Sequence, residues 1–78
     1  MKKTVLITGV AGMIGSRMAQ WILSNQQEFQ VVGIDNLSGG YLENIPEGII
    51  FIRADVATEN LDQIFQEHNI IYVLHFAA

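Results

Sequence analysis

Apolar residues gather in four short runs that more polar segments separate. The runs occupy residues 4–8, 31–35, 49–53 and 70–76, and none alternates strictly between apolar and polar positions. Continuous apolar runs of this length are typical of strands in a parallel sheet that is covered on both faces. We therefore expect four buried parallel strands.

The segment between the first two runs carries apolar residues at helical spacing. Its stripe follows the i, i+4, i+7, i+8, i+11 pattern through Ile14, Met18, Trp21, Ile22 and Asn25. Such a stripe is the buried face of an amphipathic helix. Met18 and Trp21 are therefore expected in the core rather than at a ligand.

A second helix is expected between the third and fourth runs. Its stripe consists of Leu61, Ile64, Phe65 and His68. Either Thr58 or Asn60 is a suitable cap, and the acidic Glu59 and Asp62 suit the first turn of a helix.

Residues 36–48 contain Ser38-Gly39-Gly40 and Pro46-Glu47-Gly48, which oppose a helix and predict a loop. With right-handed crossovers, the resulting element order gives an α/β parallel sheet with strand order 3-2-1-4 and two crossover helices. The order reverses between the first and fourth strands, and ligands of such sheets lie beyond the carboxyl ends of the strands at that point. Residues 9–15 and 75–78 both fall there.

Three glycines follow the first strand and open the first helix. Gly9 and Gly12 allow a sharp turn and a close approach of the backbone to a pyrophosphate, and Gly15 allows the helix to pack tightly on the sheet. The helix that begins near Met13 directs free N–H groups at an anion. A glycine triplet also occurs in ordinary strand-turn-helix units. Here the flanking elements, and an acidic residue at the end of the second strand, favour a dinucleotide site.

That acidic residue is Asp35, twenty positions after Gly15. A carboxylate accepts hydrogen bonds from both hydroxyls of an adenosine ribose and repels the 2′-phosphate of NADP, so Asp35 favours NAD. Arg17, in the first turn of the helix, is an argument for NADP, but we expect it to be an ordinary exposed arginine.

Composition narrows the function classes. A chain of 78 residues is at most one small and marginally stable domain. It is 50% hydrophobic and 15% charged, which favours a folded core over disorder. A net charge of −4 provides no basic patch, so nucleic acid is not an expected partner. Without cysteine, and with His68 and His75 lacking nearby partners, neither a disulfide framework nor a metal site is expected.

Lys2 and Lys3 followed by an apolar run resemble the start of a secretory signal. Glycines interrupt that run, Arg17 falls where a cleavage region carries small neutral residues, and the helical pattern continues past it. No segment has the roughly 20 apolar residues of a membrane span. We expect a cytoplasmic protein that does not associate with a membrane.

Four motifs, in order along the whole chain, resemble the extended short-chain dehydrogenase/reductase family, in particular its NAD-dependent sugar-nucleotide epimerases and dehydratases such as the UDP-glucose 4-epimerases. They are Thr8-Gly9-Val10-Ala11-Gly12-Met13-Ile14-Gly15-Ser16, Asp35-Asn36-Leu37-Ser38-Gly39-Gly40, Arg53-Ala54-Asp55-Val56 and His75-Phe76-Ala77-Ala78. The resemblance implies the first part of a Rossmann-type domain, without a substrate domain, and NAD as cofactor.

The resemblance also implies roles for individual residues. Besides Gly9, Gly12 and Gly15, the implied cofactor-binding residues are Met13 and Ile14 (backbone, pyrophosphate), Asp35 and Asn36 (adenosine ribose), Ser38 (the loop that follows), Asp55 and Val56 (adenine), and Phe76 and Ala77 (path to the nicotinamide ribose). Alternatives remain for two of them: Asp55 as a turn residue that caps the next helix, and Phe76 as core. His75 is expected to be a packed strand residue rather than a ligand or base.

Catalysis in the resembled family uses a Tyr-x-x-x-Lys helix and a Ser or Thr after the fifth strand. Tyr41 is followed four positions later by Ile45 and Tyr72 by Phe76, and lysine occurs only at positions 2 and 3. No catalytic residue is therefore assigned, because the lysine is needed to lower the pKa of the tyrosine.

Three hypotheses remain open. The chain is the NAD-binding amino-terminal portion of an epimerase or dehydratase, inactive by itself, whose nucleotide sugar binds only to a full-length parent. Alternatively, it is a non-catalytic module that binds NAD or associates with itself through the apolar strand 70–76. In the third hypothesis, the fold keeps the motif but binds nothing tightly.

Overall fold

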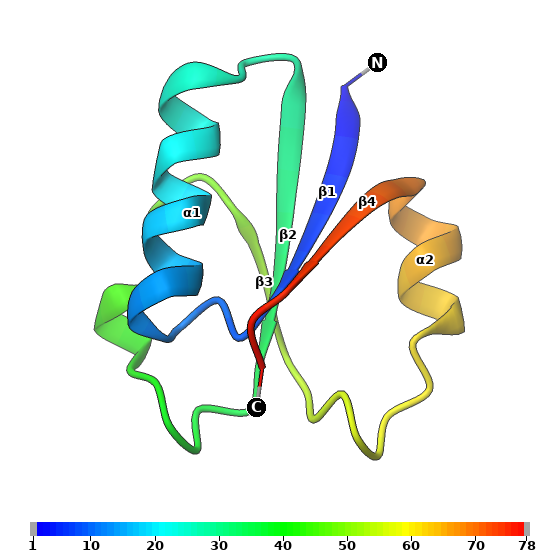
Figure 1. Cartoon of the computed structure of the whole chain (residues 1–78). Helices are drawn as coiled ribbons and strands as arrows, with labels where there is room; N and C mark the ends of the chain where they lie inside the picture. The colour runs from blue at the N-terminus through cyan, green and yellow to red at the C-terminus, as the bar shows by residue number, and fades with distance from the viewer. Residues whose placement is uncertain (1, 78) are drawn as a thin grey trace.

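The computed structural model describes residues 2–77 and contains four strands, two α-helices and one short 3₁₀ helix (Figure 1). In chain order they are β1 (Lys3–Thr8), α1 (Met13–Asn25), β2 (Phe29–Asp35), η1 (Leu42–Asn44), β3 (Ile50–Arg53), α2 (Asp62–His68) and β4 (Ile70–His75). All expected elements are present. The largest difference in a strand boundary is at β2, which begins at Phe29 rather than at residue 31.

The four strands form one parallel sheet in the order β3-β2-β1-β4, which confirms the predicted α/β topology. Thr8 at the end of β1 is paired with Ile34 of β2 and with His75 of β4. A shift in register near the start of the β1–β4 pair leaves the rest of the pair regular. All four strands therefore end at the same edge of the sheet, where their connecting segments meet.

The two faces of the sheet bury different apolar clusters, and one helix lies on each side of the sheet (Figure 1). On the α1 side, the buried residues are Val5, Ile7, Val10, Ala19, Ile22 and Val31. On the other side, where Ile64 of α2 and the preceding Leu61 add partly buried side chains, they are Leu6, Val32 and Ile34. Strands β1 and β2 thus carry the core.

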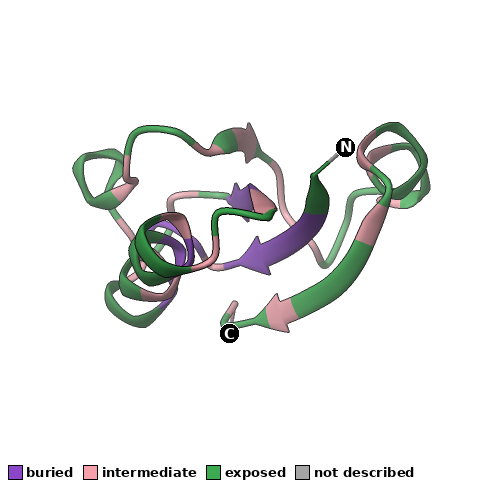
Figure 2. Cartoon of the chain, turned by 90° about the horizontal axis from the view of Figure 1, so that it is seen from above, coloured by how far each residue is buried: buried purple, intermediate pink, exposed green. Residues whose placement is uncertain are grey.

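The expectation of four buried strands is wrong for the two outer ones. β3 and β4 contain no fully buried residue, as Figure 2 shows by its green and pink outer strands. In β4, Ile71, Tyr72 and Val73 are each about half exposed. The physical reason is position: an edge strand has one neighbour, and within residues 2–77 the two helices mainly cover the middle of the sheet.

The buried stripe of α1 is not the one that apolar spacing predicted. Gly15, Ala19 and Ile22 are buried, whereas Trp21 is 53% exposed and Ile14 is 65% exposed. Small residues bring the helix close to the sheet, and this contact rotates the larger side chains outward. The prediction of a core position is therefore wrong for Trp21, while Met18 is half-buried and packs against the core.

The second helix begins at Asp62, and Leu61 precedes it without a side-chain cap. Neither predicted cap is therefore confirmed as such, although Asn60 Oδ1 accepts a hydrogen bond from Asp62 N–H at 2.9 Å. Phe65 of the expected stripe is 38% exposed. Residues 36–48 form the predicted loop, interrupted only by η1. No helix in the described part of the chain is long and apolar enough to cross a membrane.

Candidate cofactor-binding site

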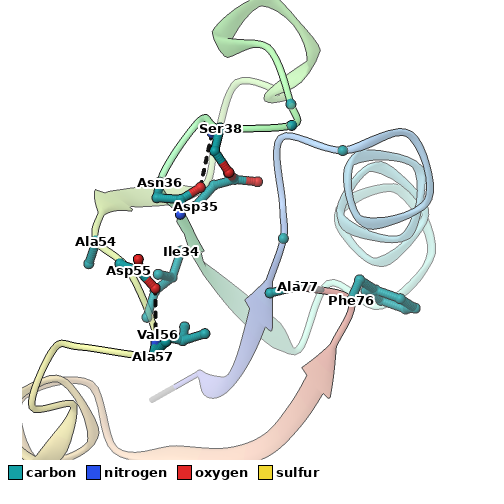
Figure 3. Close-up of a pocket in the computed structure, with 14 residues that line it drawn as sticks. Ile34, Asp35, Asn36, Ser38, Ala54, Asp55, Val56, Ala57, Phe76 and Ala77 are labelled. Atoms are coloured by element: carbon teal, nitrogen blue, oxygen red, sulfur yellow. Dashed lines mark hydrogen bonds between the residues drawn. The ribbon is translucent and has the colours of Figure 1, made fainter.

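A cavity of about 240 Å³ opens at the carboxyl ends of the strands (Figure 3). Its walls are Gly9, Gly12, Ile34, Asp35, Asn36, Ser38, Gly39, Gly40, Ala54, Asp55, Val56, Ala57, Phe76 and Ala77. Segments that follow all four strands contribute to it. It lies where the strand order reverses, as the sequence predicted.

The glycine-rich turn is fixed to both neighbouring strands. Gly9 N–H donates to the Ile34 carbonyl at 2.8 Å, and Phe76 N–H donates to the Thr8 carbonyl at 2.9 Å. Gly9 has a φ of 74°, and a Cβ there would lie 2.7 Å from the Ala77 nitrogen. Glycine is therefore required at position 9 by its backbone conformation and by the close approach of the segment after β4.

The start of α1 leaves backbone donors available. Gly12 precedes the helix and has no side chain to cap it, and its carbonyl accepts a hydrogen bond from Ser16 N–H at 3.0 Å. The first N–H groups of a helix have no partner within the helix and attract anions. Met13 and Ile14 are exposed, and neither they nor Gly15 lines the cavity, so their contact with a pyrophosphate remains a prediction.

Gly15 contacts a different element from the one expected. A Cβ at Gly15 would clash with the Gly9 carbonyl oxygen and lie 2.9 Å from the Gly9 carbonyl carbon. The close packing that requires glycine here is thus between α1 and the glycine-rich turn itself. The helix start and the turn are therefore in direct backbone contact.

Asp35 ends β2 and is only 9% exposed. Its Oδ2 accepts a hydrogen bond from Ala11 N–H at 2.9 Å, and its Oδ1 accepts one from Leu37 N–H at 2.7 Å. A carboxylate has about four acceptor positions, so two remain for hydroxyl groups in the cavity. Asp35 therefore holds the glycine-rich turn and retains the capacity to accept two further hydrogen bonds.

The segment after Asp35 bends sharply into the cavity wall. Leu37 has a φ of 63°, which non-glycine residues adopt rarely. Asn36 Oδ1 accepts a hydrogen bond from Ser38 N–H at 3.0 Å, and both side chains are exposed at the cavity rim. Figure 3 shows Asp35, Asn36 and Ser38 grouped on one side of the cavity.

The segment after β3 contributes a second carboxylate. Asp55 Oδ1 accepts a hydrogen bond from Ala57 N–H at 2.9 Å, and the Asp55 carbonyl accepts from the N–H groups of Thr58 and Glu59. Asp55 is thus a turn residue that lines the cavity, but it does not cap α2, which begins at Asp62, and its contact with adenine remains a prediction. Val56 packs against the apolar cluster on the α2 side.

Phe76 and Ala77 lie across the end of β1 from Asp55 (Figure 3). Phe76 is 38% exposed, which does not support a core role for it. His75 is exposed rather than packed, because it lies on the outer strand, and its Nδ1 shares a hydrogen bond of 2.6 Å with the buried Thr8 hydroxyl.

The structure brings together most of the residues that the sequence predicted for this site. Those lining the cavity are Gly9, Gly12, Asp35, Asn36, Ser38, Asp55, Val56, Phe76 and Ala77. The sequence analysis did not assign Ile34, Gly39, Gly40, Ala54 and Ala57. The signal that could have identified these five residues is that each lies close in sequence to an assigned site residue, in a segment at or after the end of a strand. Among the described residues, no group of three or more His, Asp or Glu side chains is placed to hold a metal ion.

Comparison with protein families decides the classification. Residues 5–78 match the model of the NAD dependent epimerase/dehydratase family. The chain belongs to this family. The resemblance inferred from the four motifs is therefore confirmed, and NAD is the cofactor after which the family is named.

Individual members of the family show the same relationship. A UDP-glucose 4-epimerase of Halalkalibacterium halodurans is 39% identical over 95% of this chain and 22% of its own length. The structure of Thermus thermophilus UDP-glucose 4-epimerase in complex with NAD superposes with a TM-score of 0.84 at 38% identity, over 96% of this chain and 24% of that one. The structure of a dTDP-glucose 4,6-dehydratase of Bacillus anthracis in complex with NAD superposes with a TM-score of 0.90 at 25% identity, over 97% of this chain and 27% of that one. The chain thus spans about a quarter of the length of these relatives.

Proposed function

We propose that this chain is the NAD-binding amino-terminal portion of a sugar-nucleotide epimerase or dehydratase that resembles the UDP-glucose 4-epimerases. The observation that carries the proposal is the cavity at the reversal of strand order, with Asp35 at its wall. Family membership and the two NAD-bound relatives support it. Whether the parent protein is an epimerase or a dehydratase depends on residues outside this chain.

The cavity suits the two halves of a dinucleotide. Asp35 and Asp55 lie toward β2 and β3, so the adenosine half belongs there, with its ribose hydroxyls on Asp35 and its amino group on Asp55. Phe76 and Ala77, across the end of β1, face the nicotinamide half. The pyrophosphate between them lies near the start of α1, where backbone N–H groups replace the cationic side chains that the cavity wall lacks.

Calorimetric titration with NAD and with NADP tests the proposal. We expect NAD to bind and NADP to bind at least about tenfold more weakly, because a 2′-phosphate would approach the Asp35 carboxylate and no cationic side chain among the described residues lines the cavity. Equal affinities would remove Asp35 as the discriminating residue. No binding of either nucleotide would leave the chain as a scaffold that keeps the motif without the function.

The 78-residue chain is expected to have no catalytic activity by itself. It contains no Tyr-x-x-x-Lys, and without that pair no general base is prepared for a sugar hydroxyl. A coupled assay with UDP-glucose and added NAD should give no epimerised product, while a full-length UDP-glucose 4-epimerase in the same assay serves as the positive control. Turnover by the chain alone would contradict the proposal.

Self-association is a second candidate function, supported by the exposed face and edge of β4. Ile71, Tyr72 and Val73 are 46%, 58% and 48% exposed, and residues 70–74 contain neither proline nor a charged side chain. Proline and charged side chains normally protect an edge strand from pairing with another chain. We propose a second copy as the partner, because two identical β4 edges can pair antiparallel about a two-fold axis.

Sedimentation at several protein concentrations tests this interface. The apparent mass should increase with concentration, and Val73→Lys should shift the chain toward the monomer because lysine on an edge strand disfavours pairing. Leu42→Lys is the matched control, since Leu42 is also exposed but lies in η1. A monomer at every concentration, or equal effects of both variants, would refute pairing through β4.

A further inference from the structure

Ala11 in the glycine-rich turn contacts two segments that are distant in sequence, the end of β2 and the residues around η1. Its N–H donates to Asp35, and its carbonyl accepts from Tyr41 N–H at 3.1 Å and from Asn44 Nδ2 at 3.0 Å. Tyr41 precedes the 3₁₀ helix η1, and Asn44 is its last residue. The helix follows the Gly39-Gly40 pair. Loop 36–45 is thus attached to the turn at its far end, in addition to the attachment through Asp35.

Gly40 shows how closely these segments approach. A Cβ at Gly40 would lie 2.6 Å from the Ala11 carbonyl carbon and 2.6 Å from its oxygen, both backbone atoms. A Cβ at the adjacent Gly39 would meet nothing within 4 Å. The contact with Ala11 therefore requires glycine at position 40, whereas it does not require glycine at position 39.

We propose that Asn44 is a positioning residue of the cofactor site, which acts with Gly40 to clamp loop 36–45 onto the glycine-rich turn. Gly9 and Gly12 line the cavity from the turn, and Asn36 and Ser38 line it from the loop. The clamp fixes the distance between these walls, so the protein groups that would contact the pyrophosphate and the ribose are in position before the cofactor binds. This inference rests on the proposed NAD binding, and Asn44 itself does not line the cavity.

Two pairs of variants test the clamp. Asn44→Ala removes the hydrogen bond to Ala11, and its control Asn25→Ala removes a similar bond from Asn25 Nδ2 to the Trp21 carbonyl at the end of α1. Gly40→Ala inserts a methyl group at the contact, and Gly39→Ala, whose Cβ would meet no atom within 4 Å, is its control for Tyr41 exchange alone, because Gly39 lines the cavity. Hydrogen exchange of the Tyr41 amide is measured without nucleotide, and NAD affinity by calorimetry.

Asn44→Ala should accelerate Tyr41 exchange and weaken NAD binding by about fivefold each, the equivalent of one net hydrogen bond. Gly40→Ala should accelerate Tyr41 exchange by more than Asn44→Ala does. Gly39→Ala should leave this exchange, and Asn25→Ala should leave both exchange and NAD affinity, within about twofold of the parent chain. The isosteric Asn44→Asp, which cannot donate when ionised, should resemble Asn44→Ala rather than the parent chain.

The two measurements separate the clamp from the proposed function. Unchanged Tyr41 exchange in Asn44→Ala and Gly40→Ala overturns the clamp, whatever the nucleotide result. Faster exchange with unchanged NAD affinity overturns the positioning role. If the parent chain binds no NAD, the positioning role falls together with the proposed function, while the exchange data still decide whether the loop is attached through Asn44.

Discussion

Replacing Gly15 by alanine is expected to destabilise the fold by about 2 kcal/mol, although the same change in an ordinary helix is stabilising. Helix propensity favours alanine over glycine by about 1 kcal/mol. Here the new Cβ would clash with the Gly9 carbonyl oxygen and lie 3.1 Å from Val10 Cα, so rigid backbone atoms of the turn would have to move. Overpacking against backbone costs about 1–3 kcal/mol or more, which exceeds the propensity gain.

A small domain without disulfides has only about 3–5 kcal/mol of total stability, so Gly15→Ala should lose roughly half of it and melt about 10 °C below the parent chain. Thermal unfolding followed by circular dichroism measures this. Gly39→Ala is the matched control, because a Cβ there would meet no atom within 4 Å and its melting temperature should change little. A Gly15→Ala chain that melts at or above the parent temperature would contradict the packing of α1 on the glycine-rich turn.

Replacing Asp35 by alanine is expected to damage both the fold and the binding of NAD. The change leaves the N–H groups of Ala11 and Leu37 without their acceptor. A buried donor without a partner costs about 1–3 kcal/mol, and the Ala11 bond is fully buried. The hydrogen bonds from the ribose hydroxyls to a carboxylate are lost as well, which should weaken NAD binding by about 30-fold or more.

Asp35→Asn tests both effects with a smaller change, because an amide keeps one acceptor oxygen and presents N–H groups on its other side. Its stability and its NAD affinity should lie between those of Asp35→Ala and the parent chain. Glu47→Ala controls for loss of a negative charge, since Glu47 is exposed in the loop before β3. Denaturant unfolding and calorimetry provide the two readouts. Parent-like stability of Asp35→Ala would show that the carboxylate does not hold the turn.

The strand order and the position of the site were predictable because each depends on local signals. Apolar runs without alternation indicated parallel strands, and right-handed crossovers then left one order for them. The spacing of Gly9, Gly12 and Gly15 before a helix identified the turn. The place of Asp35 in the cavity wall was predictable because this residue ends the second strand, beside the glycine-rich turn.

The errors arose where tertiary packing overrides a local pattern. Apolar spacing placed Trp21 in the core, but the small Gly15 and Ala19 set the contact, and the helix turned Trp21 outward. Apolar runs predicted burial of β3 and β4, but the predicted order places these two strands at the edges of the sheet, where an apolar run does not ensure burial. The attachment of Asn44 to Ala11 spans 33 positions, so no local signal could have predicted it.

The most direct test of the account is to map amide chemical shifts of the chain by NMR during titration with NAD. We predict that the largest changes occur at Gly12, Met13 and Ile14 in the turn and the start of α1, and at the cavity residues Asn36, Asp55 and Ala77. The amides of β4 upstream of His75 and of the last turn of α1 should change little. Shifts spread evenly over the chain, or confined to the outer face of β4, would contradict a cofactor site at the carboxyl ends of the strands.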